Sequence, residues 1–526
     1  MTTSTSSPET ATAMERLEAA AVDGRTENIR YRQQQLQTLH QTLTAEASAI
    51  CSALSQDGRS LSAEAETEFY LGMEAVRHFY DALDFDRELE NEYRVANGKD
   101  NPGRRVGVGM VVIRPTDHSR FYSIVTPLAA AISAGNCVVL ELQESLSQVD
   151  SVLRSSLTKA MDINTFYSNT ENMISDKSFL DAALLVDQTG SVSPPSTASP
   201  IQQQLVSSTT ARVVAVVDRT ADIEAAAQAI TRARFIFGGT SPYAPDLVLV
   251  NEFVKARFFE ACSRHATMAF ASERESAATK KVVGDQSEAT RRAVVEAETK
   301  SQVTSFGSSE FKLVDILDKN SPIMTMKITG RYLPIATCSG LVDAAFTPQG
   351  SETPLLAGYF FADPRAAKYL AQHVACAVSF INRIPIQLLV GPAAPITTAT
   401  HTPDHLHHRY TRDMFSLPRP QFVEPPAAGS PSRAADDLLH LNGGASWSEA
   451  PNGKIVTTKN IRALAVRPLA PSGLPAKNRN TGIGFFDSGF FIGAGIGLSV
   501  VLPALGWGSY ALARKGFEYA IRLKNH

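Results

Sequence analysis

The sequence predicts an α/β protein with a parallel sheet, followed by a C-terminal transmembrane helix. Short valine-rich apolar runs alternate along the chain with longer amphipathic stretches, as where helices connect parallel strands. The 526 residues are 44% hydrophobic and 20% charged, which is ordinary for a folded chain with a large buried core. This composition excludes a wholly disordered chain, a collagen and a polytopic membrane protein.

The predicted elements follow one another in a regular order. Residues 13–93 are expected to be helical, because leucine and isoleucine recur there at three- and four-residue spacings. The expected strands are 106–113, 137–140, 212–217 and 247–250, and the expected helices are 127–134, 223–234 and 253–265. A short strand at 461–466 is also expected, within a stretch from 418 to 480 that otherwise has the composition of a linker.

The C-terminal segment Gly489–Ala513 has 25 residues and no charge. As a helix it would extend about 37 Å, enough to cross a hydrocarbon core of about 30 Å. Trp507 and Tyr510 lie near its second end, where aromatic rings favour the membrane interface. The N-terminus has no apolar run and so no secretory signal. We therefore expect a single-pass tail anchor, with the body in the cytosol at the endoplasmic reticulum or another organelle surface.

The net charge and the cysteine spacing argue against nucleic acid as a partner and against a cysteine metal site. The net charge is −3 and the pI is near 6.4, so no global positive field recruits nucleic acid. The five cysteines are scattered without a C-x-x-C pair, which argues against a disulfide framework or a cysteine zinc site. The histidine cluster has the composition of a metal site, but it lies in a predicted loop, so we expect no metal. Its members are His401, His405, His407 and His408.

Six segments together resemble the aldehyde dehydrogenase superfamily, most closely its class 3 fatty-aldehyde branch. In family order they are AGNCVVL at 134–140, VDRTADI at 217–223, APDLVLV at 244–250, GRYLPI at 330–335, PLLA at 354–357 and IN at 381–382. The resemblance covers about residues 15–425. It implies a doubly wound nucleotide-binding domain, a catalytic α/β domain and a small oligomerisation arm, and a C-terminal membrane anchor also occurs among fatty-aldehyde members.

The composition of the two ends and the family resemblance of the chain between them together lead us to expect the following boundaries. Residues 1–14 form a flexible N-terminus, 15–210 a helical start with the nucleotide-binding-like domain, and 211–329 the catalytic-like domain. Residues 330–425 return to the first domain and supply the arm. Residues 426–487 form the linker, 488–513 the transmembrane helix and 514–526 a basic tail. The family further implies a homodimer or a hetero-oligomer.

The residues that the family uses for catalysis are replaced. A cysteine thiolate attacks the aldehyde in the family, and its position in the G-Q-T-C-x-A-P-D pattern is Pro242 here, beside Ser241. The position of the glutamate base is Ser208, which has no proton-accepting group at its ordinary pKa. The oxyanion-binding asparagine corresponds to His118, which either donates a hydrogen bond or is a surface-loop histidine. Cys262 lies in a predicted helix and is expected to be a core thiol rather than a substitute nucleophile.

The family's cofactor contacts are replaced as well. The lysine that contacts the adenosine ribose corresponds to Glu141, and the glutamate that binds the other ribose corresponds to Lys327. Gly190 and Ser191 resemble the family's glycine-serine turn at the pyrophosphate, with a plain turn as the alternative. No cofactor is therefore expected, and NAD(P) is expected only if the protein is active.

These replacements leave three interpretations. In the first, the chain is a membrane-anchored aldehyde-dehydrogenase-like protein without ordinary catalysis, which acts as a scaffold or as a partner subunit. In the second, it is an active NAD(P)-dependent oxidoreductase that converts fatty aldehydes to acids through other residues. In the third, it binds a lipid or another apolar ligand without turnover. Four separately placed replacements favour the first interpretation.

Overall fold

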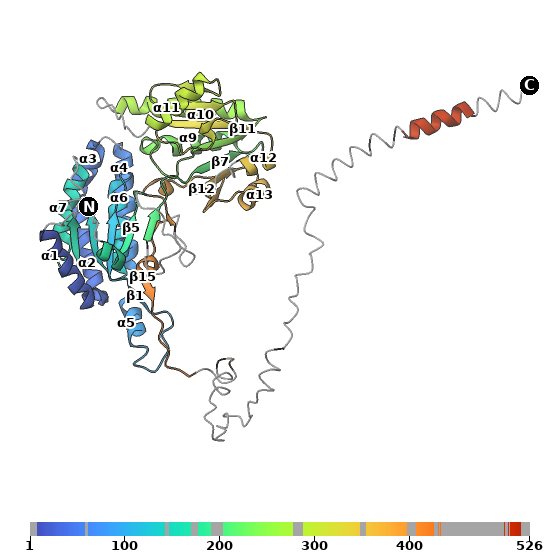
Figure 1. Cartoon of the computed structure of the whole chain (residues 1–526). Helices are drawn as coiled ribbons and strands as arrows, with labels where there is room; N and C mark the ends of the chain where they lie inside the picture. The colour runs from blue at the N-terminus through green and yellow to red at the C-terminus, as the bar shows by residue number, and fades with distance from the viewer. Residues whose placement is uncertain are drawn as a thin grey trace, which may run out of the picture. The chain divides into compact units, whose positions relative to one another are not determined.

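The fold comes from a computed structural model of the chain. It describes residues 8–57, 61–142, 147–169, 177–190, 204–276, 288–347, 354–396 and 407–425, together with 430, 432, 466, 499, 503 and 505–516. The chain divides into two compact units, Met1–Glu424 and Pro425–His526. All sheets named below belong to the first unit (Figure 1).

The first half of this unit is built on a six-stranded sheet with the order β14-β6-β5-β2-β3-β4. Its strands are β2 (Met110–Arg114), β3 (Cys137–Glu141), β4 (Phe166–Asn169), β5 (Leu184–Asp187), β6 (Gln204–Ser207) and β14 (Pro395–Ile396). All neighbouring pairs are parallel except β14 with β6. The central strands β2 and β3 are buried throughout, which explains their uninterrupted apolar sequences.

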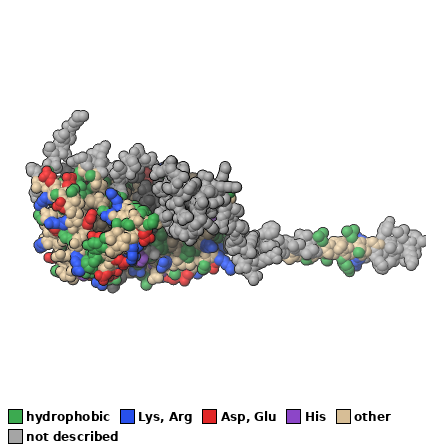
Figure 2. Space-filling model, turned by 90° about the horizontal axis from the view of Figure 1, so that it is seen from below, with side chains coloured by type: hydrophobic (Ala, Val, Ile, Leu, Met, Phe, Trp, Pro, Cys, Tyr) green, Lys and Arg blue, Asp and Glu red, His purple; other side chains and the backbone are tan. Residues whose placement is uncertain are grey.

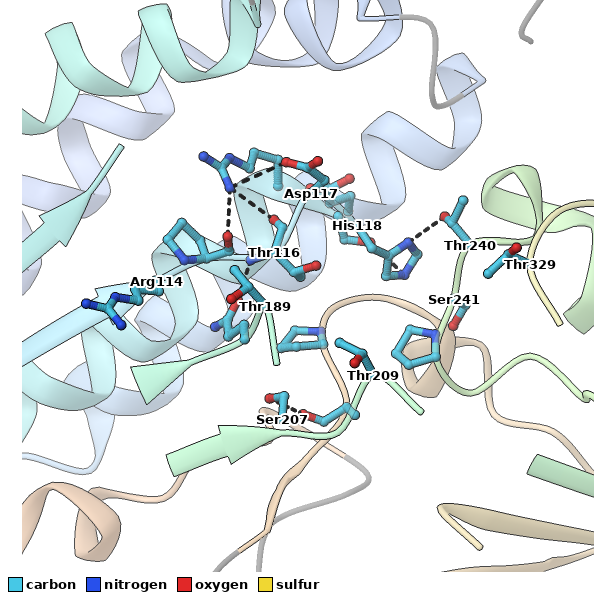
Figure 3. Close-up of a pocket in the computed structure, with 18 of the residues that line it drawn as sticks. Arg114, Thr116, Asp117, His118, Thr189, Ser207, Thr209, Thr240, Ser241 and Thr329 are labelled. Carbon is cyan, nitrogen blue, oxygen red and sulfur yellow. Dashed lines mark hydrogen bonds and ion pairs between the residues drawn. The ribbon is translucent and has the colours of Figure 1, made fainter. Parts of the chain in front are cut away.

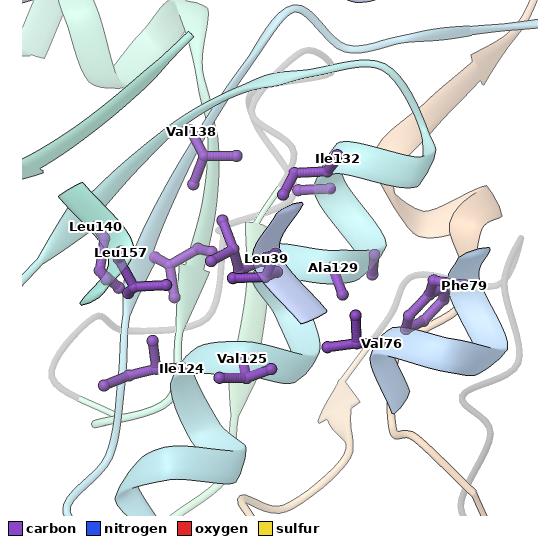
Figure 4. Packing of buried hydrophobic residues seen from close by; sticks show 14 of the residues in the cluster. Leu39, Val76, Phe79, Ile124, Val125, Ala129, Ile132, Val138, Leu140 and Leu157 are labelled. Carbon is purple, nitrogen blue, oxygen red and sulfur yellow. The ribbon is translucent and has the colours of Figure 1, made fainter. Parts of the chain in front are cut away.

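Helices cover both faces of this sheet. The helices are α1 (Pro8–Val22), α2 (Ile29–Ala45), α3 (Ala47–Gln56), α4 (Ser62–Asp81), α5 (Phe85–Tyr93), α6 (Arg120–Ser133), α7 (Gln148–Ala160) and α8 (Lys177–Ala182). Successive strand residues point to opposite faces, so Val112 packs with Leu17 of α1, whereas Val111 packs in the cluster of α2, α4, α6 and α7. Figure 4 shows that second cluster, in which Leu39, Val76 and Ala129 come from three different helices.

The second half has a seven-stranded sheet with the order β13-β12-β7-β8-β11-β10-β9. Its strands are β7 (Val213–Val217), β8 (Leu247–Asn251), β9 (Val303–Gly307), β10 (Lys312–Ile316), β11 (Tyr332–Cys338), β12 (Ala357–Phe361) and β13 (Ser379–Ile381). All are parallel to their neighbours except β9. The helices are α9 (Ile223–Phe235), α10 (Lys255–Ser276), α11 (Glu288–Thr299), α12 (Leu341–Phe346) and α13 (Pro364–His373). Buried clusters on both faces complete a doubly covered sheet, so the α/β prediction is confirmed.

The chain returns to the first half later than the boundary predicted at residue 330. Strands β11, β12 and β13 all lie in the second sheet, and the chain rejoins the first sheet at β14. It then forms a small antiparallel pair, in which β15 (Ser416–Pro418) pairs with β1 (Arg105–Gly107). The parallel pairing of β12 with β7 explains why the return is later than predicted. It keeps the segment 357–361 in the second sheet.

The prediction of a membrane-anchored location is contradicted. Among the described residues, no helix is both long and apolar enough to cross a membrane. Within Gly489–Ala513 the structure describes 499, 503 and 505–513, and the rest of that segment lies outside the described residues. The continuous helical run there, 505–516, extends about 18 Å, which is shorter than a hydrocarbon core of about 30 Å. The predicted linker at 426–487 and the strand at 461–466 lie almost entirely outside the described residues.

Candidate functional site

A cavity of about 860 Å³ is enclosed by residues from both halves of the first unit. Its wall includes the ends of β2, β3 and β6 in the first half and the loop that precedes β8 in the second (Figure 3). Ligands of open α/β sheets bind outside the carboxyl ends of the strands, where loops and helix N-termini meet. Five of the predicted positions line this one cavity: His118, Glu141, Ser208, Pro242 and Lys327.

The loop at the predicted nucleophile position is held rigidly. Pro242 lies in the cavity wall, and its carbonyl oxygen accepts a hydrogen bond of 2.7 Å from Lys327 Nζ. Ser241 is buried, and its hydroxyl accepts a bond of 3.3 Å from the amide of Tyr243. Neither side chain has a neighbouring base among its bonded partners in the described chain, so this loop has no activated nucleophile.

None of the five cysteines lines the cavity. Cys262 is fully buried on α10 among apolar side chains, as expected of a core thiol, and burial raises its pKa to about 12. Burial likewise raises the pKa of Cys137 and Cys338 to about 12 and that of Cys51 to about 11, and it raises the pKa of Cys376. A thiolate is the reactive form of cysteine, so none of these groups is poised to attack a carbonyl at neutral pH.

Serines follow strand β6 where the family has its base. The hydroxyl of Ser207 donates a bond of 2.7 Å to the Ala393 carbonyl, and Ser208 accepts a bond of 2.9 Å from the amide of Ala211. Both serines line the cavity. They fix the turn between the two sheets, and neither has the chemistry of a general base.

His118 joins the two halves across the cavity. Its Nε2 lies 2.9 Å from the Leu389 carbonyl oxygen and its Nδ1 lies 2.9 Å from Thr240 Oγ1 (Figure 3). Burial and, to a smaller extent, the nearby cationic Arg409 lower the pKa of His118 to about 4, and the bond to the Leu389 carbonyl offsets part of this lowering. The ring is neutral at pH 7, so Nε2 donates to the Leu389 carbonyl and Nδ1 is an acceptor that faces Thr240 Oγ1, whose hydroxyl also lies 2.8 Å from the Phe237 carbonyl oxygen. With both nitrogens engaged, the ring is a fixed contact between the halves.

Glu141 is paired with a buried arginine. Its Oε2 accepts a bond of 2.7 Å from Nε of Arg114, and both side chains are buried at the ends of neighbouring strands β3 and β2. Arg120 forms a second such pair, with bonds of 2.7 and 3.1 Å to the two oxygens of Asp150. Both arginines line the cavity, and each is already bonded to a carboxylate of the same chain.

The helix N-termini that face the cavity are also bonded to internal carboxylates. Glu68 on α4 accepts bonds of 2.8 and 3.3 Å from the amides of Phe121 and Tyr122, in the first turn of α6. Asp57, just after α3, accepts bonds of 2.9 and 3.3 Å from the amides of Gln148 and Val149 at the start of α7. Exposed amides at a helix N-terminus bind phosphate, but here a carboxylate oxygen takes that place.

Lys327 is part of a buried ion-pair cluster around Asp246. Its Nζ lies 2.8 Å from Asp246 Oδ2, and Asp246 also accepts bonds of 2.7 Å from the Val213 amide and 3.0 Å from the Ile328 amide. Arg234 lies 3.7 Å from the same carboxylate, and both side chains are fully buried. Burial lowers the pKa of Lys327, which the charge of Asp246 partly offsets. Lys327 therefore holds the loop before β8 in place.

The predicted phosphate turn is described in part. Gly190 follows β5 with a φ of +67°, and a Cβ atom there would lie 2.7 Å from Thr209 Oγ1. A glycine is needed at this position because of both the left-handed backbone and the close contact. Ser191 lies outside the described residues, as do His401 and His405 of the histidine cluster. Among the described residues, no group of three or more candidate ligands is placed to hold a metal ion.

Sequence reasoning missed the acidic groups contributed by the helices. Glu68 carries a weak signal, since it is the only acidic side chain in the buried stripe of α4, which also contains Ala65, Gly72 and Val76. Asp57 carries no signal of its own, because its partners at the start of α7 are 91 and 92 residues further along the chain. Such contacts are visible only once α3, α4, α6 and α7 are packed together.

The described residues do not fit an NAD(P) cofactor. A dinucleotide carries a pyrophosphate, which needs unoccupied amides or cations. In this cavity the two arginines are paired with Glu141 and Asp150, Lys327 is paired with Asp246, and the first turns of α6 and α7 are bonded to carboxylates. We therefore derive no chemical step through this cofactor.

Sequence comparison finds similarity to known aldehyde dehydrogenases. No family model matches the chain. It is 21% identical over 408 residues to the dimeric NADP-preferring aldehyde dehydrogenase of Rattus norvegicus, covering 73% of this chain and 87% of that protein. It is 22% identical over 418 residues to the 4,4'-diaponeurosporen-aldehyde dehydrogenase of Staphylococcus aureus, covering 74% and 88%.

Solved structures of aldehyde dehydrogenases superpose on this chain. The substrate-bound AldH of Staphylococcus aureus superposes with a TM-score of 0.61 at 19% identity, covering 80% of this chain and 95% of that one. Glyceraldehyde-3-phosphate dehydrogenase GapN of Methanocaldococcus jannaschii, solved with NADP, gives 0.59 at 13% identity, covering 78% and 93%. The chain therefore has the α/β fold of the aldehyde dehydrogenases, and its sequence is similar to theirs.

Proposed function

We propose that this chain is an aldehyde-dehydrogenase-like protein that does not oxidise aldehydes through a thiol, and that it acts as a scaffold or as a partner subunit in an oligomer. The observation that carries the proposal is the loop at Pro242. The position of the nucleophile has no reactive side chain, and its carbonyl is tied to Lys327, the residue at a cofactor position. A cysteine in that place would need an unhindered, activated sulfur.

The base and the cofactor positions support the same proposal. Ser208 is a turn residue with no acid–base group, and Glu141 places a carboxylate in the cavity where the family has a cation. An active oxidoreductase would have to bind a dinucleotide against these paired charges. An apolar ligand fits the wall less well, since serine, threonine and charged side chains make up most of it.

The first experiment measures oxidation directly. The purified full chain is mixed with NAD⁺ or NADP⁺ and a panel of aliphatic and aromatic aldehydes, and reduced nucleotide is followed by its absorbance. We expect no aldehyde-dependent increase, while a cooperative thermal transition shows that the sample is folded. A thiol-dependent aldehyde dehydrogenase in the same assay is the positive control. Sustained aldehyde-dependent reduction would overturn the proposal.

A second experiment counts reactive thiols. The native chain is treated with a thiol-specific chromogenic reagent at neutral pH, and the same reaction is run on the unfolded chain. We expect slow labelling of the native protein and complete labelling of the five cysteines when it is unfolded. A single rapidly labelled cysteine, protected by an aldehyde, would identify a nucleophile and argue for the oxidoreductase.

A third experiment tests the scaffold or subunit role. Sedimentation of the full chain over a range of concentrations is expected to show self-association, in line with the oligomer that the family resemblance implies. A monomer at all concentrations, together with absent catalysis, would leave only a hetero-oligomeric role, which mixing with an active relative would test by the appearance of a mixed species.

A further inference from the structure

Acidic groups outnumber basic ones in the wall of the cavity. Among the described residues, five carboxylates and three cations line it: Asp57, Glu68, Asp117, Glu141 and Asp150, against Arg114, Arg120 and Lys327. Each of the three cations lies within 2.8 Å of a carboxylate of the same chain. Arg114 and Arg120 are each paired with a carboxylate of the wall, and Lys327 shares Asp246 with Arg234. Carboxylates are therefore in excess among the side chains that line the cavity.

Several hydroxyl groups of the wall donate their hydrogen to groups of the same chain. The hydroxyl of Ser147 donates to Asp57, that of Thr189 to Asp187, and that of Ser207 to the Ala393 carbonyl. A hydroxyl has one hydrogen to donate, so these three hydroxyls have no donor left for a ligand. A ligand that fits this wall must bring donors of its own.

Glu68 differs from the other carboxylates of the cavity. Its side chain is buried, it lines the cavity, and its Oε1 accepts both bonds from the first turn of α6. Its Oε2 has no hydrogen-bond partner within the described part of the chain. Glu68 Oε2 is not one of the fully buried side-chain atoms that lack a partner, so a ligand, a water molecule or a proton can reach it from the cavity.

We propose that the cavity binds a small organic cation bearing N–H donors, a primary ammonium compound, whose charge is balanced by Glu68 Oε2. This inference rests on the proposed function, because it takes the family's cavity as a binding site without oxidation. An ammonium group offers three donors and a positive charge, which match an acceptor-rich wall with an excess of carboxylates. A polyanion would bind weakly, because the cations of the wall are already paired and the carboxylates would repel it. A neutral diol would form hydrogen bonds but would gain nothing from the negative charge of Glu68.

Protonation of Glu68 supports the assignment. Burial raises the pKa of Glu68 to about 7, and the bonds from Tyr122 and Phe121 lower it only in part. The titratable groups around it are Glu64 on α4, Cys51 on α3 and His118 before α6. Between about pH 6 and about pH 8, Cys51 and His118 stay neutral, because burial raises the pKa of the thiol to about 11 and lowers that of the imidazole to about 4. A bound ammonium stabilises ionised Glu68, so affinity rises with pH across this range.

The test compares two ligands with the same carbon chain, one with charged ammonium ends and one with neutral hydroxyl ends. Binding of 1,4-diaminobutane and of 1,4-butanediol to the full chain is measured by calorimetry near pH 8. We expect the diamine to bind at least about tenfold more tightly than the diol, and its affinity to fall as the pH is lowered to about 6. Equal affinity for both ligands, or a higher affinity for inorganic phosphate than for the diamine, would overturn the inference.

Variants locate the site. E68Q keeps an oxygen that accepts from Phe121 and Tyr122, so the start of α6 stays capped while the charge is lost. It is expected to weaken diamine binding at least about tenfold and to remove its pH dependence. E224Q removes a surface carboxylate that pairs with Arg264 far from the cavity wall, and it is expected to bind the diamine like the natural chain. Unchanged binding by folded E68Q contradicts the role of Glu68.

The two proposals fail in different ways. If the diamine does not bind and no aldehyde is oxidised, the ligand assignment is wrong and the non-catalytic function stands. If aldehyde-dependent reduction of NAD(P)⁺ is observed while the diamine binds through Glu68, the non-catalytic function is wrong and the site remains.

Discussion

The two halves of the first unit treat their buried charges differently. In the second half, Asp246 collects Lys327, Arg234 and the amides of Val213 and Ile328 into one closed cluster. In the first half, the charged pairs lie at strand ends and helix N-termini in the cavity wall, and Glu68 keeps an oxygen without a partner in the described chain. Charges in the second half therefore fix the fold, whereas in the first half Glu68 keeps one acceptor oxygen that a ligand can use.

The largest effect is expected at the closed cluster. D246A removes the partner of Lys327 and Arg234 and leaves two amides without their acceptor. Breaking a buried ion pair costs about 3–5 kcal/mol, because an uncompensated charge stays buried. Urea denaturation measures the loss, with the surface variant E288Q as a control whose midpoint should not move. A small loss for D246A would show that the cluster is not structural.

The next effect concerns pH and isolates Glu68. Its pKa is raised from 4.5 to about 7 in the folded chain by burial. Between these values the folded state holds the proton and the unfolded state has released it, so stability falls as pH rises, by about 3 kcal/mol in all. E68Q removes this fall, and the difference between the two chains, measured by urea denaturation from about pH 4 to about pH 8, should follow that course.

His118 contributes with the opposite sign in an overlapping range. Its pKa is lowered from 6.5 to about 4 by burial, so its contribution is present above the unfolded value and is lost as pH falls towards about 4. In the natural chain the pH dependence of the free energy of unfolding contains the contributions of both Glu68 and His118. The contribution of Glu68 is therefore obtained as the difference between the natural chain and E68Q. A difference that is flat with pH would contradict the raised pKa.

A smaller effect is expected when a cation of the first half is released. E141Q leaves Arg114 without its carboxylate but keeps an acceptor for one hydrogen bond. Inorganic phosphate should then bind about tenfold more tightly than to the natural chain, which corresponds to about 1.4 kcal/mol. Calorimetry measures this gain, and the reverse result, no gain in a folded sample, would mean that pairing with Glu141 is not what keeps anions out.

The smallest effect is expected at the contact between the halves. T240V removes the hydroxyl that contacts both His118 Nδ1 and the Phe237 carbonyl oxygen, and it preserves the shape of the side chain. A net loss of about 1 kcal/mol is expected for one hydrogen bond, seen as a lower urea midpoint. S241A, at the next residue, is a matched control because the Ser241 hydroxyl only accepts from the Tyr243 amide. An equal loss of unfolding free energy in both variants would show that the contact between the halves adds nothing to stability.

The fold was largely predictable because its signals are local. The runs at 137–140, 212–217 and 247–250 became β3, β7 and β8, since strands buried on both faces must be apolar at every position. The predicted return at residue 330 fell too early, because the choice of neighbour for β11 and β12 depends on pairing between distant strands. The predicted membrane anchor was inferred from the length and composition of an uncharged segment, and within the part of the chain that the structure describes no helix is long and apolar enough to cross a membrane.

The sequence alone determined which residue types occupy the family's positions, including proline for cysteine at 242 and a carboxylate for lysine at 141. Only the tertiary structure decided what those residues do. Lys327 and Asp246 are 81 residues apart, Glu68 and Phe121 are 53 apart, and His118 and Thr240 are 122 apart. The chemistry of each side chain follows from the residue type. Which charged groups are paired, and which one keeps an oxygen without a partner in the described chain, is decided only when elements distant in the sequence pack around one cavity.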